Sequence, residues 1–476
     1  MLSFHHVAIR SSKETTSVQA QLEAVSIGEK KVSRKRGESL EFQCYKVSFG
    51  ELSVAEGLSV PLVGEIRCPF KFINRANQEQ LSIANQDLWA WAVRQGFTKN
   101  SQKNKEAFDK YNLVQFAAYT VVNVPKLEVD LIGRMRSGVS VSELVSSILE
   151  TSESLEASQL LRQSKYLLWL FRHDNWVEEQ TNINVIREVH TRCYDALNTL
   201  NGSPFVKEDY FQLHPEGTLE DLSFINTLIL SMGNIGYDFN LAFHTRHFAK
   251  GQQYLGYDDF CQTVNRYFES QVAEALYRSM DEPIEPELYR QMSRRLRQEA
   301  CGVYTVNYSA LAECQVPISK ESQELSPRIL RISELFSALI CHFNDLISAP
   351  REINKSNWKN NDLALLTEEQ SSISPTISKE ANYTLAVSRL FQKINADLQG
   401  AFLEIEAITE RDFASNPDQI RSVLTYLAII QEWAIGSMPA QMALDRYSKH
   451  RAEGPYIKKG ECLDGDSNFW RFASVD

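Results

Sequence analysis

Residues 342–355 read His-Phe-Asn-Asp-Leu-Ile-Ser-Ala-Pro-Arg-Glu-Ile-Asn-Lys, and this stretch governs the interpretation of the whole chain. Within it Asn344, Ser348 and Glu352 recur at every fourth position, a spacing that places three side-chain oxygens on one face of an α-helix. Apolar residues flank them, and a buried polar stripe is costly unless a partner satisfies it. Amide, hydroxyl and carboxylate oxygens suit Mg²⁺ better than zinc or copper. The simpler alternative is that these three polar residues line the solvent-exposed face of an amphipathic helix.

The composition is that of a folded globular protein. Of the 476 residues, 43% are hydrophobic and 23% are charged, which argues against wholesale disorder and allows a large core. The net charge of −11 disfavours broad nucleic-acid binding, although a local basic pocket for an anion stays compatible with it. The eight cysteines include no C-x-x-C pair, so we expect reduced thiols in a cytoplasmic protein. We expect neither a signal peptide nor a membrane span.

The pattern of polar and apolar residues divides the chain into three parts. Residues 1–65 contain charged stretches and two short strand-like runs, and we expect an irregular N-terminal extension wrapped on the main body. Residues 66–456 carry helical periodicity, without internal repeats or sustained alternation of period two, and predict one all-α domain. Residues 457–476 are expected to be a C-terminal tail.

Glycine and proline breakers separate the predicted helices. These helices are expected at residues 77–96, 105–122, 137–156, 157–180, 181–200, 218–248, 257–280, 284–300, 303–314, 325–356, 380–409 and 416–450.

A second acidic site follows the apolar run at 166–171. Asp174 and Glu178 are four residues apart, so their carboxylates share a helix face. The neighbouring Glu179 is an alternative to Glu178, and the pattern does not choose between them. Alone, this pair also fits a helix that leaves the core into solvent.

Two further clusters contain positively charged arginine side chains. Arg294 and Arg297 precede a helix break at Gly302, and Arg446 and Tyr447 lie near the end of the last strong helix. A guanidinium offers paired donors to phosphate oxygens. A solvated basic face is the simpler reading of the first cluster.

These stretches, taken in order, resemble the class I terpene synthases of the microbial type with a single α domain. Residues 169–178 resemble their aspartate-rich motif, with departures at Asn175 and Glu178. Residues 344–352, N-D-x-x-S-x-x-x-E, resemble their second metal-binding motif, in which Asn, Ser and Glu hold one magnesium ion. Pro350 is a departure inside that motif, since a proline within a helix costs about 3 kcal/mol or more.

The resemblance implies the fold of a class I terpenoid synthase, an all-α bundle around a deep apolar pocket. It implies that three Mg²⁺ ions are bound by Asp174, Glu178, Asn344, Ser348 and Glu352. It implies that the diphosphate is held by Arg297, Arg351, Arg446 and Tyr447, with Arg297, Arg446 and Tyr447 as catalytic groups and Arg294 as the alternate to Arg297. Candidate pocket-lining aromatics are Trp169, Phe171, Phe343 and Trp433, each of which fits ordinary core packing equally well.

The implied activity is that of a lyase of isoprenoid biosynthesis. A linear prenyl diphosphate, farnesyl or geranylgeranyl, loses its diphosphate, and the carbocation cyclises to a terpene hydrocarbon or alcohol. One alternative is a chain-elongating prenyltransferase, which would carry a second aspartate-rich motif in place of 344–352. The other is a non-catalytic helical scaffold. The substrate length, the product, the role of residues 1–65 and the oligomeric state, including a homodimer, are not encoded in these motifs.

Overall fold

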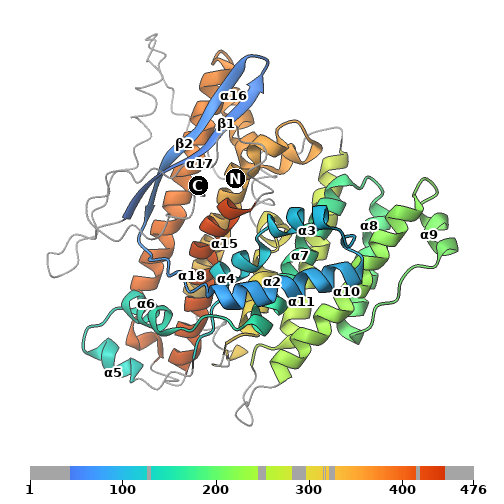
Figure 1. Ribbon diagram of the computed structural model, residues 1–476. Helices are drawn as coiled ribbons and strands as arrows, with labels where there is room; N and C mark the ends of the chain where they lie inside the picture. Colours follow the sequence, from blue (N-terminus) through green and yellow to red (C-terminus); the bar gives the residue numbers. More distant parts are fainter. Residues whose placement is uncertain are drawn as a thin grey trace, which may run out of the picture.

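The structure is a computed structural model that describes residues 43–125, 130–244, 254–280, 296–314, 316, 318–320, 327–413 and 419–444. Within them a two-stranded sheet lies beside a large set of helices (Figure 1). The first half comprises β1 (Gln43–Ala55), β2 (Leu58–Cys68), α2 (Gln78–Gln95), α3 (Gln102–Asp109), α4 (Leu113–Thr120), α5 (Leu131–Arg136), α6 (Val141–Thr151), α7 (Ala157–Glu179), α8 (Ile183–Thr199), α9 (Lys207–Leu213) and α10 (Leu219–His244). The second half comprises α11 (Tyr257–Ser279), α13 (Val303–Leu311), α15 (Pro327–Glu352), η1 (Ser356–Asn360), α16 (Asp362–Ile373), α17 (Lys379–Glu406), η2 (Glu410–Phe413) and α18 (Gln419–Ala443).

The predicted all-α main domain is confirmed, with differences at particular helices. The single helix expected at 105–122 is two, α3 and α4, because Asn112 between them adopts a left-handed backbone with φ of 50°. Helices α5, α9 and α16 are short and were not predicted. Of the helix expected at 284–300, residues 296–300 are helical and the rest lie outside the described residues.

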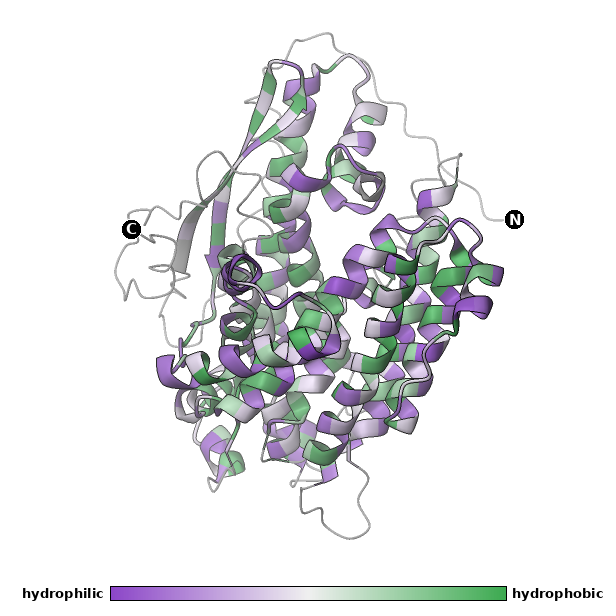
Figure 2. Ribbon diagram, turned by 45° about the vertical axis from the view of Figure 1, so that its right-hand side comes forward, coloured by the Kyte–Doolittle hydropathy of each residue, from purple (hydrophilic) through white to green (hydrophobic). Residues whose placement is uncertain are grey.

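The N-terminal segment forms a β-hairpin from residue 43 onward, with register shifts between Ser48 and Glu51 and between Ser53 and Ala55, where we expected an irregular extension. Strands β1 and β2 pair antiparallel, and the link between them contains Gly57, whose φ of 71° suits a tight turn. Hydrophobic and hydrophilic residues alternate along the strands (Figure 2), and Val60 and Leu62 are fully buried. The hairpin packs on α17 and α15, so it is part of the core. Residues 1–42 lie outside the described residues.

Helix α15 occupies the middle of the bundle. It packs against α17 on one side and α18 on another, while α7 packs against α2, α4 and α10 (Figure 1). The residues of α15 that face the neighbouring helices are almost all buried, as expected if its polar stripe is buried. No helix in the described part of the chain is apolar over a length that could cross a membrane.

Helices α4 and α18 approach each other at backbone distance. Gly436 permits this, because a Cβ at that position would collide with the carbonyl group of Tyr119. One turn earlier on each helix, Trp433 and Phe116 are in contact, with ring centroids 5.8 Å apart. The close approach therefore brings two aromatic rings together at one point in the bundle.

Candidate active site

One pocket gathers residues from both predicted motifs. It encloses about 930 Å³ of empty space, including its open mouth, between α4, α7, α11, α15 and α18. Its polar lining includes Asp174, Glu178, Tyr267, Gln271, Glu274, Arg278, Arg297, Asn344, Arg351, Glu352, Asn360 and Gln441. Its apolar lining includes Phe116, Leu167, Leu170, Phe171, Ala300, Val306, Ile340 and Trp433.

Four of the predicted site residues are not part of the described pocket lining. Arg294, Arg446 and Tyr447 lie outside the described residues. Ser348 is fully buried behind the pocket surface.

Trp169 and Phe343, two of the candidate pocket-lining aromatics, are not among the residues that line this pocket. Trp169 donates from Nε1 to the carbonyl of Leu228 at 2.9 Å, and Phe343 packs edge-on against Phe49 of the hairpin, with centroids 5.4 Å apart. For Trp169 the reason is helical geometry, because it lies about 200° around the helix from the pocket residue Phe171.

The two motif helices meet through a single guanidinium group. Asp174 and Glu178 line the pocket from α7, and Arg351 and Glu352 line it from α15. Arg351 Nη2 lies 2.8 Å from Glu352 Oε1 and 3.4 Å from Glu178 Oε1. All three side chains are at least four-fifths buried, so these charges attract each other with little screening by water.

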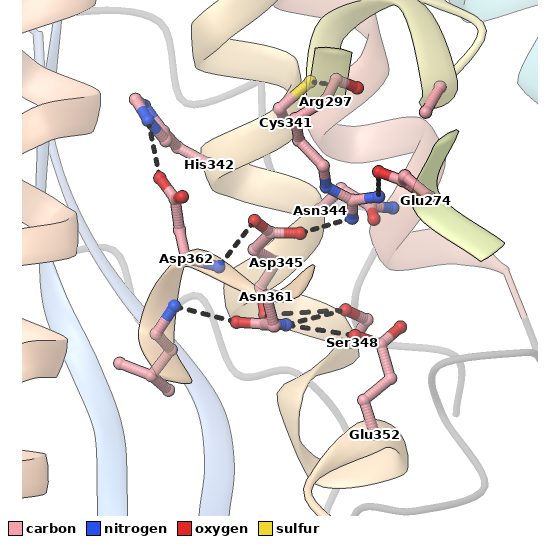
Figure 3. Close-up of polar contacts among 12 residues, drawn as sticks. Glu274, Arg297, Cys341, His342, Asn344, Asp345, Ser348, Glu352, Asn361 and Asp362 are labelled. Carbon is pink, nitrogen blue, oxygen red and sulfur yellow. Dashed lines mark hydrogen bonds and ion pairs between the residues drawn. The ribbon is translucent and has the colours of Figure 1, made fainter. Parts of the chain in front are cut away.

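Arg297 is held by acidic side chains on two other elements (Figure 3). Its Nη2 lies 2.5 Å from Asp345 Oδ1, and its Nη1 lies 3.6 Å from Glu274. Burial raises the pKa of Asp345 to about 6, and Arg297 opposes that rise. Burial also raises the pKa of Glu274 to about 7, against Arg297 and Arg278, and the charge of Asp174 adds to the rise. The raised pKa values therefore come first from burial, and the nearby arginines offset part of the rise.

A second layer of charge supports Asp345 from behind. Asp345 Oδ2 accepts a hydrogen bond from the backbone N–H of Asp362 at 2.9 Å, and His342 contacts Asp362 at 2.9 Å (Figure 3). The other ring nitrogen of His342 lies 2.7 Å from Asp397 Oδ2. Burial lowers the pKa of His342, but the two carboxylates outweigh it and raise this pKa to about 9. A charged His342 therefore ties α15 to α16 and α17 directly beneath the motif.

Several pocket residues carry no motif signal in the sequence. Tyr267, Gln271 and Glu274 come from α11, and Gln441 comes from α18. Gln441 Oε1 accepts a hydrogen bond from Asn344 Nδ2 at 3.0 Å, which orients the amide of the motif asparagine. The available signal was a pair of polar residues, Gln271 and Glu274, on the buried face of α11.

The donor set suits a hard cation such as Mg²⁺. The motif side chains on the pocket surface, Asp174, Glu178, Asn344 and Glu352, offer oxygen atoms. Among the described residues no three His, Cys, Asp or Glu side chains lie close enough to hold a metal on their own. A metal here would therefore draw on the amide and hydroxyl oxygens of the motif as well as on carboxylates.

Comparison with known proteins agrees with this geometry. Residues 165–376 match the family model described as terpene synthase family 2, C-terminal metal binding. No curated protein matches the sequence. Among solved structures, a cucumene synthase variant is 14% identical, with a TM-score of 0.51 over 80% of this chain and 99% of the other. The structure of a-eudesmol synthase is also 14% identical, with a TM-score of 0.50 over 79% of this chain and 97% of the other.

At such low identity the two structures bear on the fold alone, which is the class I α-helical fold. The family model bears on the site, because the matched residues run from before Asp174 to beyond Glu352 and so contain both motifs. Residues 165–376, within this helical fold, are therefore similar to the C-terminal metal-binding domain of terpene synthase family 2.

Proposed function

We propose that the protein is a Mg²⁺-dependent terpene cyclase. It ionises a linear prenyl diphosphate, farnesyl or geranylgeranyl, cyclises the carbocation to a hydrocarbon or alcohol, and releases diphosphate, as a carbon–oxygen lyase. The observation that carries the proposal is the meeting of oxygen donors from α7 and α15, the guanidinium of Arg297 and an aromatic wall in one pocket.

Five side chains would hold the metal, which we propose to be three Mg²⁺ ions: Asp174, Glu178, Asn344, Ser348 and Glu352. Bound there, the ions would supply positive charge that stabilises the departing diphosphate. The family's metal-binding domain supports metal use by this segment.

The arginines would bind the diphosphate oxygens. Arg297 and Arg351 both face the pocket, and each is now paired with carboxylates that it would exchange for phosphate oxygens. Fixed guanidinium donors stabilise the charge that develops on the leaving group. Arg446 and Tyr447 follow α18, and we propose that they complete the contacts to the diphosphate.

The apolar wall would shape the reaction. Phe116 packs edge-on against Phe171 and is tilted against Trp433, with centroid distances of 5.8 Å in both pairs. Aromatic faces stabilise a nearby cation by roughly 0.5–2 kcal/mol where water is excluded. The same rings keep water from quenching the carbocation.

We propose a cytoplasmic location, supported by the six free cysteines among the described residues.

The test is a product assay. Purified protein is incubated with Mg²⁺ and, separately, with geranyl, farnesyl, geranylgeranyl and geranylfarnesyl diphosphate, and the organic extract is analysed by gas chromatography–mass spectrometry. A cyclic product from one substrate supports the proposal and identifies the chain length. Longer linear diphosphates formed only with isopentenyl diphosphate would instead indicate a chain-elongating prenyltransferase.

The variant that tests the metal assignment in the same assay is Asn344→Ala. It removes one proposed metal ligand from a position on α15 where alanine is a good helix former. We expect no product and an unchanged helical circular dichroism signal. An active Asn344→Ala enzyme would refute the metal assignment.

A further inference from the structure

Asn361 makes hydrogen bonds to three residues of the second motif (Figure 3). Its side chain is fully buried. From Nδ2 it donates to the backbone carbonyl of Asp345 at 2.8 Å, to Glu352 Oε2 at 3.1 Å and, more weakly, to Ser348 Oγ at 3.5 Å. One amide therefore touches two of the three proposed metal ligands on α15.

The position of these contacts matters because of Pro350. Proline has no N–H, so the last turn of α15 lacks one backbone hydrogen bond just before the helix ends at Glu352. Asp345 and Ser348 lie before the proline, and Glu352 lies after it. The amide of Asn361 therefore bridges the weakened turn and restores a connection that the helix backbone alone does not supply.

We infer that Asn361 is a positioning residue for the metal site, an inference that rests on the proposed function. It holds the Glu352 carboxylate and the Ser348 hydroxyl at a fixed separation across Pro350. Residues that hydrogen-bond to metal ligands orient them, and their loss typically weakens metal affinity 10–100-fold.

Asn361 also has a structural role, which the test must separate. Its Oδ1 accepts a hydrogen bond from the N–H of Leu363 at 2.9 Å and so caps the N-terminus of α16. Serine is as good a cap as asparagine but has no amide donor. Asn361→Ser therefore keeps the cap and removes the bridge.

Asn382 provides a matched control. It is also buried, and its Nδ2 donates to the carbonyl of Thr367 at 3.0 Å and to Ser371 Oγ at 2.6 Å, which joins α17 to α16 away from the pocket lining. Asn382→Ser loses the same kind of buried amide contacts. Its effect on stability alone is therefore comparable.

The measurement is the melting temperature, titrated with Mg²⁺ at a fixed concentration of inorganic pyrophosphate, since binding to the native state raises this temperature. We expect the Mg²⁺ concentration for the half-maximal shift to rise 10–100-fold in Asn361→Ser and to stay at the wild-type value in Asn382→Ser. An unchanged value in Asn361→Ser would overturn the positioning role alone. A wild-type protein without any shift would overturn the metal site, and this inference with it.

A second variant tests the link to Pro350. In the Asn361→Ser background, Pro350→Ala restores a backbone donor to the last turn of α15. We expect the Mg²⁺ concentration for the half-maximal shift to return at least threefold toward the wild-type value. No recovery would overturn the claim that the bridge compensates for the proline.

Discussion

Arg351 and Glu178 lie 173 positions apart in the sequence, and their side chains form an ion pair of 3.4 Å across the pocket. The same Nη2 atom of Arg351 donates to Glu352 at 2.8 Å. Two acidic walls that face each other across a low-dielectric pocket repel. The guanidinium group between them offsets this repulsion, so Arg351 stabilises the fold before it meets any substrate.

Removing that charge should make the stability of the folded protein depend more strongly on added metal. In Arg351→Gln, two mostly buried carboxylates lose a cationic partner, and we expect unfolding in chelator to require about 1–3 kcal/mol less free energy. Added Mg²⁺ should raise the melting temperature more than it does in the wild type. Arg328→Gln, which breaks a half-exposed pair with Glu404 of 2.9 Å, is the control and should change stability by less than about 0.5 kcal/mol. Equal Mg²⁺ responses in Arg351→Gln and wild type would contradict this role.

The two tryptophans should respond differently to substitution. Trp433 lines the pocket, so Trp433→Leu should change the product distribution and lower turnover by up to about 30-fold, because a cation-stabilising ring is lost. Trp169 lies outside the pocket, and Trp169→Phe should cost about 1 kcal/mol of stability through its lost hydrogen bond to Leu228 and leave the products unchanged. Product profiles by mass spectrometry decide between the two. Identical products from Trp433→Leu and wild type would remove Trp433 from the proposed wall.

The hairpin should contribute strongly to the stability of the bundle. Phe49 is fully buried against Phe343, the residue before Asn344 on α15. Phe49→Ala should lower the free energy of unfolding by about 3–5 kcal/mol, measured in urea. Val63 lies on the exposed face of the same hairpin, and Val63→Ala should change it by less than about 0.5 kcal/mol. A loss below about 1 kcal/mol for Phe49→Ala would mean that the hairpin is not part of the cooperative core.

Glu432 should make stability depend on pH. Burial raises its pKa from 4.5 to about 7, against the opposing effect of its ion pair with Arg75. The folded state therefore binds this proton more tightly than the unfolded state. Its contribution to stability is complete below pH 4.5 and is lost as the pH rises through about 7.

The corresponding measurement compares wild type with Glu432→Gln in urea at pH 5 and pH 8. The variant cannot titrate here, so its stability relative to wild type should increase by about 1–3 kcal/mol between the two pH values. A difference between the two proteins that does not change with pH would show that Glu432 keeps one protonation state throughout.

Most of the helices could be predicted from the sequence, because long amphipathic segments such as 157–180 and 325–356 repeat the same hydrophobic periodicity over many turns. Short helices and strands show a weaker periodic signal in the sequence. Helix α16 has only 12 residues and lies between two linkers, and the strands of the hairpin extend beyond the short runs that indicated them.

The site was predictable where one helix carries a whole pattern, as for Asn344 and Glu352. It was not predictable where a single residue from another helix completes it. Gln441 and Glu274 are brought to the motifs only by tertiary packing, and no spacing along the chain relates them to Asn344. The rotation of α7 and α15 about their axes, which removes Trp169 and Phe343 from the pocket, is likewise a property of packing.

Gly436 limits how this pocket can change over evolutionary time. Because a side chain at that position would meet the Tyr119 carbonyl, α4 and α18 can keep this close separation only while residue 436 is glycine. The rings of Phe116 and Trp433, one turn away, line the pocket beside this contact. A bulkier ligand would therefore be accommodated by smaller side chains in place of those rings and not by a wider gap between the two helices.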